Sequence, residues 1–307
     1  MQAFSAIPIF IAVVENGSFS SAASQLNITK SAISKRITQL EEELGIRLLN
    51  RTTRKLSLTE AGSRYYEYVV QSFNLAQQGV DAVTELQGSP RGRLKVTTPM
   101  TFGVLHVAPL ISEFLKQYPD VTIDLQLEDK MVDLVEQGFD VGIRIGQLAE
   151  SNLVAKRLAP CVSVLCASPE YLATHDTIVT PRDLINHNCL LYSYYRGGTE
   201  WSFTQHHQEH RVVPSGSLRV NNSEALRKAS LGGAGIANLP TFIVANDLLE
   251  GRLVHVLADY QLPQHAVYAV FPERKHMPLK VRAFIDFIAD KLGTDTPYWD
   301  KGLKLSQ

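Results

Sequence analysis

The sequence is poor in cysteine and has no long apolar segment. Its three cysteines, Cys161, Cys166 and Cys189, stand in apolar segments that resemble strands. This favours buried thiols in a reducing cytoplasm over a disulfide framework, and it leaves a redox role open. No basic segment followed by an apolar one stands at the N-terminus, and no apolar run approaches membrane-spanning length. We therefore expect a cytoplasmic protein without a membrane partner.

Signatures of enzymes are also scarce. The sequence has neither a Gly-x-Ser-x-Gly turn nor a cysteine with an evident histidine partner. The segment 233–238, GAGIAN, is close to a dinucleotide-binding fingerprint, but it stands between a helix and a strand instead of opening a helix. His206, His207 and His210 have metal-like spacing in a polar segment, where surface histidines are favoured over a metal site. We expect no catalytic residue, no metal and no cofactor.

Charge is nearly balanced over the chain. The formal net charge of the 307 residues is −1 and 45% of them are hydrophobic, which indicates a globular chain long enough for two or more domains. Residues 1–60 hold seven Lys or Arg against five Glu, so they carry +2 and leave −3 for the remainder. Because this asymmetry is modest, an interface with nucleic acid has to be sought in local patterns.

The stretch 26–45, LNITKSAISKRITQLEEELG, predicts an amphipathic helix with Thr29 as its N-cap and Gly45 at its end. Its apolar stripe, at the spacing of a buried face, consists of Ile33, Ile37, Leu40 and Leu44. The other side carries short, polar or basic side chains able to approach another surface, namely Ser31, Ala32, Ser34, Lys35, Arg36, Thr38 and Gln39. The glutamates at 41–43 would be repelled by a polyanion, so only the N-terminal half can enter a DNA major groove.

The flanking segments fit the same interpretation. Upstream, IPIFIAVVENGS predicts a helix that ends at Gly17, and SFSSAASQL predicts a second short helix capped by Ser20. Asn27 and Ile28 fit the turn of a helix-turn-helix. Downstream, a basic segment with alternating Leu56 and Leu58 predicts a hairpin that could reach flanking phosphates.

The run from Phe10 to Gly62 resembles the winged helix-turn-helix of the LysR-type transcriptional regulators over its whole length. The resemblance implies a DNA-binding repressor or activator that responds to a small molecule. It also implies DNA contacts on the helix and on the wing. With Gln39 from the outward face, the predicted contacts are Ser31, Ser34, Lys35, Arg36, Gln39, Arg51, Arg54 and Lys55. We assign residues 1–58 to this domain.

Residues 59–87 predict a helix about 40 Å long, without proline. Its apolar stripe is too long and narrow for one helix to bury, which favours a second copy of the helix as partner over an intramolecular core. The stripe residues predicted for dimerisation are Tyr65, Val69, Phe73, Val80 and Val83. In the family this helix makes the dimer, so we expect a homodimer or a tetramer. Residues 88–92, GSPRG, form a hinge by composition.

From residue 93 onward, strands alternate with helices. RLKVTT, VTIDLQL and VGIRI predict strands, and GVLHVAPLISEFLKQYP and KMVDLVEQGF predict helices, which indicates a parallel α/β sheet. A second such unit follows, and the chain returns through AVYAVF and the helix LKVRAFIDFIADKL. This region resembles the LysR-type effector domain, a relative of type 2 periplasmic binding proteins. The resemblance implies a two-lobed α/β effector-binding domain at 93–307, with lobe I at 93–161 and 266–292, lobe II at 162–265, and a cleft between them.

Ligands in open α/β sheets bind beyond the carboxyl ends of strands, near helix N-termini. In lobe I this position holds Thr98, Met100, Thr101 and Phe102, and in lobe II it holds Asn222 and Ser223. Each of these residues could instead cap or line the next helix. The remaining candidates, at or near two other strand ends, are Glu128 and Arg144, which could equally pair with each other. The effector's charge therefore stays open.

Two functions compete on this basis. The first is a ligand-responsive transcriptional regulator whose expected partners are double-stranded promoter DNA, a second copy of the chain, a small-molecule effector and RNA polymerase. The alternative is a small-molecule binding protein or enzyme in which the N-terminal domain is only an interaction module.

Overall fold

The computed structural model describes residues 2–51, 56–84, 88–146, 152–195, 200–273 and 277–303. The chain divides into two units, residues 1–88 with 133–138, and residues 89–132 with 139–307. Each unit is described by itself.

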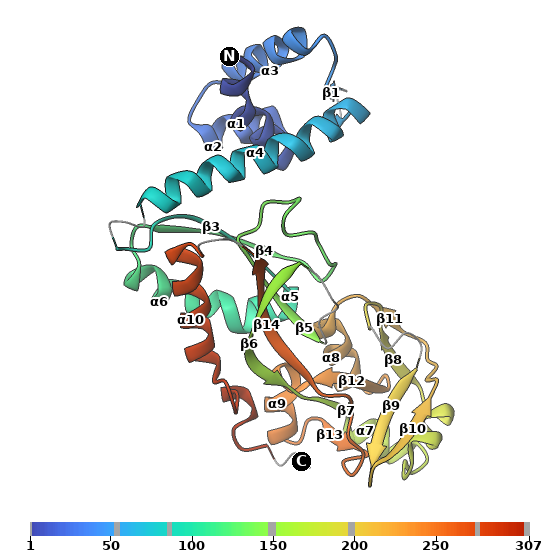
Figure 1. Cartoon of the computed structure of the whole chain (residues 1–307). Helices are drawn as coiled ribbons and strands as arrows, with labels where there is room; N and C mark the ends of the chain where they lie inside the picture. The colour runs from blue at the N-terminus through green and yellow to red at the C-terminus, as the bar shows by residue number, and fades with distance from the viewer. Residues whose placement is uncertain are drawn as a thin grey trace. The chain divides into compact units, whose positions relative to one another are not determined.

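Short helices and a hairpin precede a long helix in the first unit (Figure 1). The strands of the hairpin are antiparallel, with Leu49 opposite Leu58. The elements are α1 (Gln2–Glu15), α2 (Phe19–Leu26), α3 (Lys30–Leu44), β1 (Leu49–Arg51), β2 (Leu56–Leu58) and α4 (Glu60–Thr84). This is the order of elements that the sequence predicts for a winged helix-turn-helix followed by a long helix.

The ends of α3 are as predicted, whereas the cap of α2 is not. The Thr29 side chain accepts from the Ala32 backbone N–H, and Gly45 ends α3 in a left-handed conformation with φ of 68°. For α2 the prediction of Ser20 as cap is wrong. The helix starts one residue before it, and the side chain of Ser18 accepts from the Ser21 N–H at 3.1 Å.

The apolar stripe of α3 builds the core of the first unit. Ile33, Ile37 and Leu40 are buried, and they pack in one cluster with Phe10 of α1. The prediction of a buried Leu44 is wrong, because that residue of the last turn is 41% exposed. The hairpin lies close to the start of α4, since a Cβ added to Gly62 would stand 2.0 Å from the Leu48 carbonyl oxygen. Only glycine permits this approach of helix and strand.

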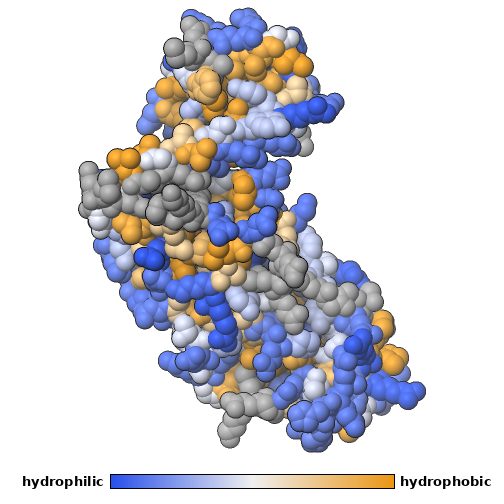
Figure 2. Space-filling view, viewed as in Figure 1, coloured by the Kyte–Doolittle hydropathy of each residue, from blue (hydrophilic) through white to orange (hydrophobic). Residues whose placement is uncertain are grey.

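Helix α4 has two parts that differ in environment. Toward its N-terminus Tyr65 packs on Phe10, with ring centroids 5.4 Å apart, and Val69 is only 5% exposed. This corrects the prediction of a dimer face for Val69, which belongs to the buried core of its own chain, whereas Tyr65 is half-buried and packs against that core. Farther along, large apolar side chains are exposed on α4, and Figure 2 shows hydrophobic as well as polar residues on this surface. They are Phe73, Leu75, Val80 and Val83.

Lobe I of the second unit is built on a five-stranded sheet of order β4-β3-β5-β14-β6. Strand β3 is parallel to β4 and β5, whereas β14 is antiparallel to β5 and β6. The elements of this lobe are β3 (Gly92–Thr98), α5 (Met100–Phe102), a π-helical turn η2 (Gly103–Val107), α6 (Ala108–Gln117), β4 (Val121–Leu127), β5 (Val141–Gly146), β6 (Leu153–Cys161), β14 (His265–Pro272) and α10 (Leu279–Leu292).

Lobe II carries a second five-stranded sheet, of order β11-β8-β12-β7-β13, and the separate hairpin β9-β10. Strand β12 is parallel to β8 and antiparallel to β7. The elements of this lobe are β7 (Ser163–Ala167), α7 (Pro169–Thr174), η3 (Pro181–Asn186), β8 (Cys189–Tyr192), β9 (Trp201–Gln205), β10 (Gln208–Val212), β11 (Arg219–Val220), α8 (Ser223–Leu231), β12 (Ile236–Pro240), α9 (Thr241–Leu249) and β13 (Val254–Val256). The chain then returns to lobe I.

Two predictions about residues 93–307 are corrected. Each large sheet is mixed rather than parallel. In lobe I the antiparallel strand is β14, and in lobe II it is β7. Each of these strands enters its sheet directly from the other lobe, so no helix within the lobe reverses the chain before it. The helix predicted at 130–139 is a single turn. The Asp133 carboxylate accepts from the N–H groups of Val135 and Glu136, at 2.8 and 3.0 Å, and Gly138 turns the chain with φ of 68°.

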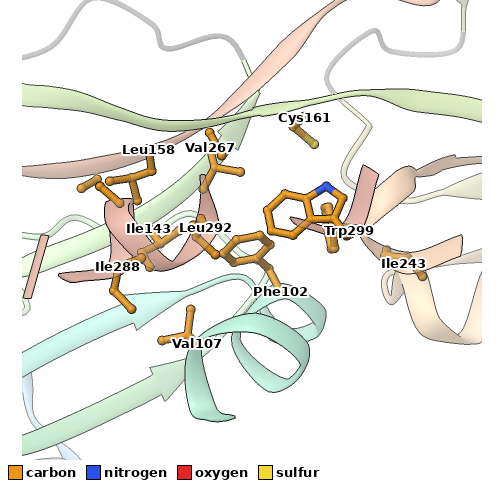
Figure 3. Close-up of a cluster of buried hydrophobic side chains, with 14 of the residues drawn as sticks. Phe102, Val107, Ile143, Leu158, Cys161, Ile243, Val267, Ile288, Leu292 and Trp299 are labelled. Carbon is orange, nitrogen blue, oxygen red and sulfur yellow. The ribbon is translucent and has the colours of Figure 1, made fainter. Parts of the chain in front are cut away.

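A core of aromatic and aliphatic side chains connects the elements of the second unit (Figure 3). Phe102 packs edge-on against Phe242 of α9 and against Trp299 of the 3₁₀ turn η4 (Tyr298–Asp300), with centroids 5.1 and 5.9 Å apart. Beside them His106 is buried and makes contacts through both ring nitrogens, to the Tyr298 hydroxyl at 2.5 Å and the Phe242 carbonyl at 3.0 Å. Trp299 also lies edge-on to Phe242 of lobe II, with ring centroids 6.2 Å apart, so the segment after α10 contacts both lobes. Within the described part of the chain, no helix has the length and apolar character needed to span a membrane.

Candidate functional site

The exposed face of α3 is the first candidate site. Ser31, Lys35, Arg36 and Gln39 are exposed, and Ser34 is half-buried, while Ile33 and Ile37 between them face the core. The predicted DNA-binding residues of this helix therefore lie on its accessible side. Because the helix is anchored through its apolar stripe, these side chains are held on a rigid support.

A hollow of about 480 Å³ lies between this face and the N-terminal part of α1. It is lined by polar and charged groups of α3, with Ser5 of α1 within 3.5 Å of the Arg36 guanidinium. The lining residues are Ser5, Ala6, Ala32, Lys35, Arg36, Gln39, Leu40 and Glu43. Lys35 and Arg36 thus border a concave, partly basic surface.

The glutamates that end α3 do not all have the same role. The Glu41 carboxylate accepts hydrogen bonds from the backbone N–H groups of Leu48 and Leu49, at 2.9 and 3.0 Å, and so ties the end of α3 to the first strand of the hairpin. Glu42 and Glu43 are exposed. The acidic end of the helix thus positions the hairpin, while its N-terminal half keeps the basic groups.

The basic residues predicted on the wing are described only in part. Arg51 ends strand β1, and its side chain is not among those described. Arg54 and Lys55 lie outside the described residues.

The second candidate site lies where β3 and β4 of lobe I end. The N–H of Met100, the first residue of α5, donates to Asp129 Oδ1 at 2.9 Å. Burial is the main cause that raises the pKa of Asp129, the hydrogen bond from Met100 lowers it, and the neighbouring Glu128 raises it further. Thr98 and Thr101 are buried, at 0% and 7% exposure, and among the described residues neither hydroxyl has a hydrogen-bond partner. These two hydroxyls are therefore buried polar groups whose hydrogen-bonding capacity is not used by the described residues.

Lobe II meets this position with the ends of β8 and β11. Asn222 caps α8 through its Oδ1, which accepts from the Ala225 N–H at 3.0 Å, and its Nδ2 stands 3.6 Å from the Met100 sulfur across the lobes. Ser223 hydrogen-bonds to the side chain of Tyr192. Burial raises the pKa of Tyr192 to about 12, and the charge of Asp129 contributes to the shift. The charge of Asp129 in lobe I thus acts on Tyr192 in lobe II.

The remaining predicted effector residues lie in different surroundings. Phe102 is fully buried in the aromatic cluster of Figure 3, so it supports the site from the core instead of lining it. Glu128 is exposed, and its backbone N–H donates to the Thr98 carbonyl at 3.0 Å. Arg144 is buried within β5 and donates through Nη1 to the Ile143 carbonyl at 3.0 Å.

Sequence reasoning missed Asp129 and Tyr192. Asp129 follows the end of β4, and Tyr192 is the last residue of β8. The rule that pointed to Thr98 applies to both, since each stands at the carboxyl end of a strand beside β3 or β12. The apolar segment that begins at Cys189 was predicted to be a strand, but the residue at its carboxyl end was not considered as a ligand contact, so Tyr192 was missed.

The three cysteines are buried in the core, and two of the three histidines with metal-like spacing form a hairpin turn. Cys161, Cys166 and Cys189 are buried and unpaired, as predicted, and burial raises the pKa of each thiol to about 12. His206 and His207 form the turn of the β9-β10 hairpin, with φ of 48° and 64°. No group of three metal-ligating side chains occurs in the described ranges.

Comparison with known proteins gives matches along most of the chain. A family model described as a bacterial regulatory helix-turn-helix protein of the lysR family matches residues 4–63, and one described as a LysR substrate binding domain matches residues 87–293. The transcriptional regulator PtxR of Pseudomonas aeruginosa is 37% identical over 288 residues, 93% of this chain and 92% of that protein. CrgA of Neisseria meningitidis is 37% identical over 295 residues, 94% of this chain and 97% of that protein.

Solved structures agree with these sequence relatives. The full-length Vibrio cholerae virulence activator AphB has a TM-score of 0.63 and 30% identity, covering 93% of this chain and 98% of its own. The structure of CrgA has a TM-score of 0.61 and 34% identity, covering 94% of this chain and 99% of its own. These likenesses confirm the predicted fold class, a winged helix-turn-helix with a long helix and a two-lobed α/β domain.

Proposed function

Because the chain belongs to the LysR family of bacterial transcriptional regulators, we propose that it recognises promoter DNA through the exposed face of α3 and binds its effector where the two lobes meet. It is a DNA-binding regulator with a substrate-binding domain, and not an enzyme. The observation that carries the proposal for DNA is the division of α3 into a buried apolar stripe and an exposed basic face.

The N-terminal half of α3 enters the major groove in this proposal. Lys35 and Arg36 read base edges or phosphates from the hollow beside α1, with Gln39 farther along, and Ser31 and Ser34 allow close approach. Arg51, Arg54 and Lys55 contact the flanking phosphates from the wing. The acidic C-terminal end of α3 stays away from the DNA.

The effector site is proposed at the ends of β3 and β4 and of β8 and β11. Thr98 and Thr101 offer their hydroxyls, Met100, Asn222 and Ser223 border the site, and Asp129 and Tyr192 are added from the structure. Glu128 and Arg144 are proposed at its edge. Phe102 does not line the site, but it is buried in the core and so holds α5 in place.

The remaining assignments follow the family. Residues 1–58 form the DNA-binding domain, 59–87 the linker helix, 88–92 the hinge and 93–307 the effector domain, with the lobes divided as the sequence predicts. A second copy pairs along the exposed apolar residues of α4, Phe73, Val80 and Val83, to give a dimer that can pair into a tetramer. The regulator meets DNA in the cytoplasm, and RNA polymerase is a further proposed partner.

Gel-shift titration with promoter DNA tests the proposal. Lys35→Ala is expected to weaken specific binding by roughly 1 to 3 kcal/mol and to relax sequence preference, because the residue faces outward on the half that enters the groove. Lys116→Ala, an exposed lysine on α6, is the matched control and should leave binding unchanged. Equal binding by both variants would remove α3 from the interface.

A further inference from the structure

At the proposed effector position of lobe I, a backbone N–H that could bind a ligand already donates to a side chain of the same chain. A free N–H at the start of a helix is where a ligand carboxylate commonly binds. Here the Met100 N–H already donates to Asp129 Oδ1 at 2.9 Å, and the Glu128 N–H donates to the Thr98 carbonyl at 3.0 Å. A carboxylate of the protein thus already occupies the backbone amide that an anionic effector could otherwise use.

The carboxylates nearest to this position are also unfavourable to an anion. The cation proposed at the edge of the site, Arg144, is buried and donates to the Ile143 carbonyl of its own strand. Glu128 and Asp129 follow β4 directly, and the charge of Asp129 reaches Tyr192 of the opposite lobe. Lys130 follows them and is exposed. An effector carboxylate placed beside Thr98 would meet two like charges, one of them partly removed from water.

Lobe II uses its anion-binding groups internally as well. The Ala225 N–H at the start of α8 is capped by Asn222 at 3.0 Å. The basic residues of α8 are paired, since Arg227 donates to Glu224 at 2.8 Å and to Asp247 Oδ1 at 2.9 Å, and Lys228 lies 4.0 Å from Glu224. The Arg227 cation is thus committed to carboxylates of its own lobe, while the exposed Lys228 makes only a long contact with Glu224.

The groups that remain favour a different chemistry. The buried hydroxyls of Thr98 and Thr101 lack hydrogen-bond partners among the described residues, so they can donate or accept. The carboxylates of Asp129 and Glu128 accept hydrogen bonds from N–H and O–H groups. We infer that the effector is a neutral or positively charged molecule carrying N–H or O–H donors, such as an amine, an amide or an alcohol, and not a carboxylate. This inference rests on the effector position proposed above.

The test uses probes that share a skeleton and differ in charge, namely benzoate, benzamide and benzylamine, titrated calorimetrically into the full chain. Asp129→Ala removes the charge and frees the Met100 N–H, whereas Asp129→Asn removes the charge but keeps an acceptor for that N–H. The control is Asp120→Asn, the same loss of charge at the exposed residue that precedes β4.

Wild-type protein is expected to bind benzamide or benzylamine at least about tenfold more tightly than benzoate, a difference of about 1.4 kcal/mol. Asp129→Ala should raise the affinity for benzoate by about tenfold and lower that for benzylamine, because it both removes repulsion and opens the amide. Asp129→Asn should lower affinity for benzylamine and raise that for benzoate less than alanine does. Asp120→Asn should match the wild type.

Two results would overturn the inference. One is wild-type protein that binds benzoate more tightly than both other probes. The other is Asp129→Ala with no more affinity for benzoate than Asp120→Asn has, which decides the matter even where the wild type binds no probe. A probe whose affinity is unchanged in Asp129→Ala and in Thr101→Val binds elsewhere and contradicts the effector position itself. The DNA assignment is judged separately, by the gel shift of Lys35→Ala.

Discussion

The two proposed binding surfaces are assembled in different ways. The DNA-binding residues of the first unit come from one helix and one hairpin, between residues 31 and 55, whereas the effector residues of the second unit are spread from residue 98 to residue 223. In the DNA-binding domain, the helical spacing of apolar residues in α3 alone separates the buried face from the face proposed to contact DNA. In the second case, strand order in two sheets decides which residues meet. The difference can be tested by asking whether damage to one unit leaves the other intact.

The largest effect is expected from Val69→Asp. Val69 is buried in the core of the first unit, so an unpaired carboxylate there should lower the free energy of unfolding of that unit by about 4 kcal/mol. DNA binding should be lost, while ligand binding by the second unit persists. Circular dichroism during urea unfolding measures the change.

Val80→Asp is the matched control, because Val80 is 57% exposed on the same helix. It should leave the first unit stable and weaken the dimer, which sedimentation measures. A Val69→Asp protein as stable as the Val80→Asp protein would mean that Val69 does not support the first unit.

The next effect is a pH dependence confined to the second unit. Burial lowers the pKa of His106 to about 4, against the opposing hydrogen bond to the Phe242 carbonyl. Between a pH of about 6.5 and about 4 the unfolded chain binds a proton at His106 that the folded chain does not, so stability falls as pH falls through this window. The loss should reach about 3 kcal/mol at most.

Urea unfolding at a pH of about 7.5 and about 5 checks this. His106→Gln should flatten the dependence of the second unit, and His207→Gln, at an exposed hairpin turn, should leave it as in the wild type. Equal pH dependence in all three proteins would show that His106 does not cause it.

A smaller effect is expected on the wing. Arg54→Ala should weaken binding to all DNA sequences by about 2 kcal/mol, because a charge-assisted hydrogen bond to phosphate is lost. The slope of log affinity against log salt should fall by about one. Gel shifts over a salt series measure both quantities. A loss confined to one sequence would instead make Arg54 a base-reading residue, like Lys35.

The smallest effect is expected for Thr101→Val. The change keeps the shape of the side chain and removes an unpartnered hydroxyl, so the fold should survive and effector affinity should fall by roughly 1 kcal/mol. Calorimetry measures it once a ligand is found. Wild-type affinity in both Thr98→Val and Thr101→Val would move the effector position away from the end of β3.

Sequence patterns predicted most of the helices and strands correctly where one period was uninterrupted. Examples are the residues Ile33, Ile37 and Leu40 of α3 and the helix α10, because their burial follows from 3.6-residue spacing. The spacing fails at Leu44, which lies in the last turn of α3 and is exposed. The failure at 130–139 has a local cause, since Asp133 bonds to nearby backbone amides in competition with a helix. Periodicity also could not tell that Tyr65 and Val69 pack on α1, because the stripe of α4 looks the same along its length.

The effector site was predictable only in part. Thr98 and Asn222 were found by their place at strand ends, which is a rule of topology. That the amide of Met100 is already occupied could not be predicted, because it depends on the Asp129 side chain, 29 residues away, reaching one backbone N–H. Fully buried Phe102 shows the opposite error, since a residue at the right position in the sequence can still point into the core.

The contact of η4 with His106 limits how far the effector domain can be shortened at its C-terminal end. The family match ends at residue 293, but Tyr298 and Trp299 lie beyond it and cover His106 and Phe102. A fragment that stopped at residue 293 would open this aromatic cluster to solvent and would lose a tether between α10 and α9. Truncated or C-terminally fused proteins should therefore keep the chain through residue 303, the last that the structure describes.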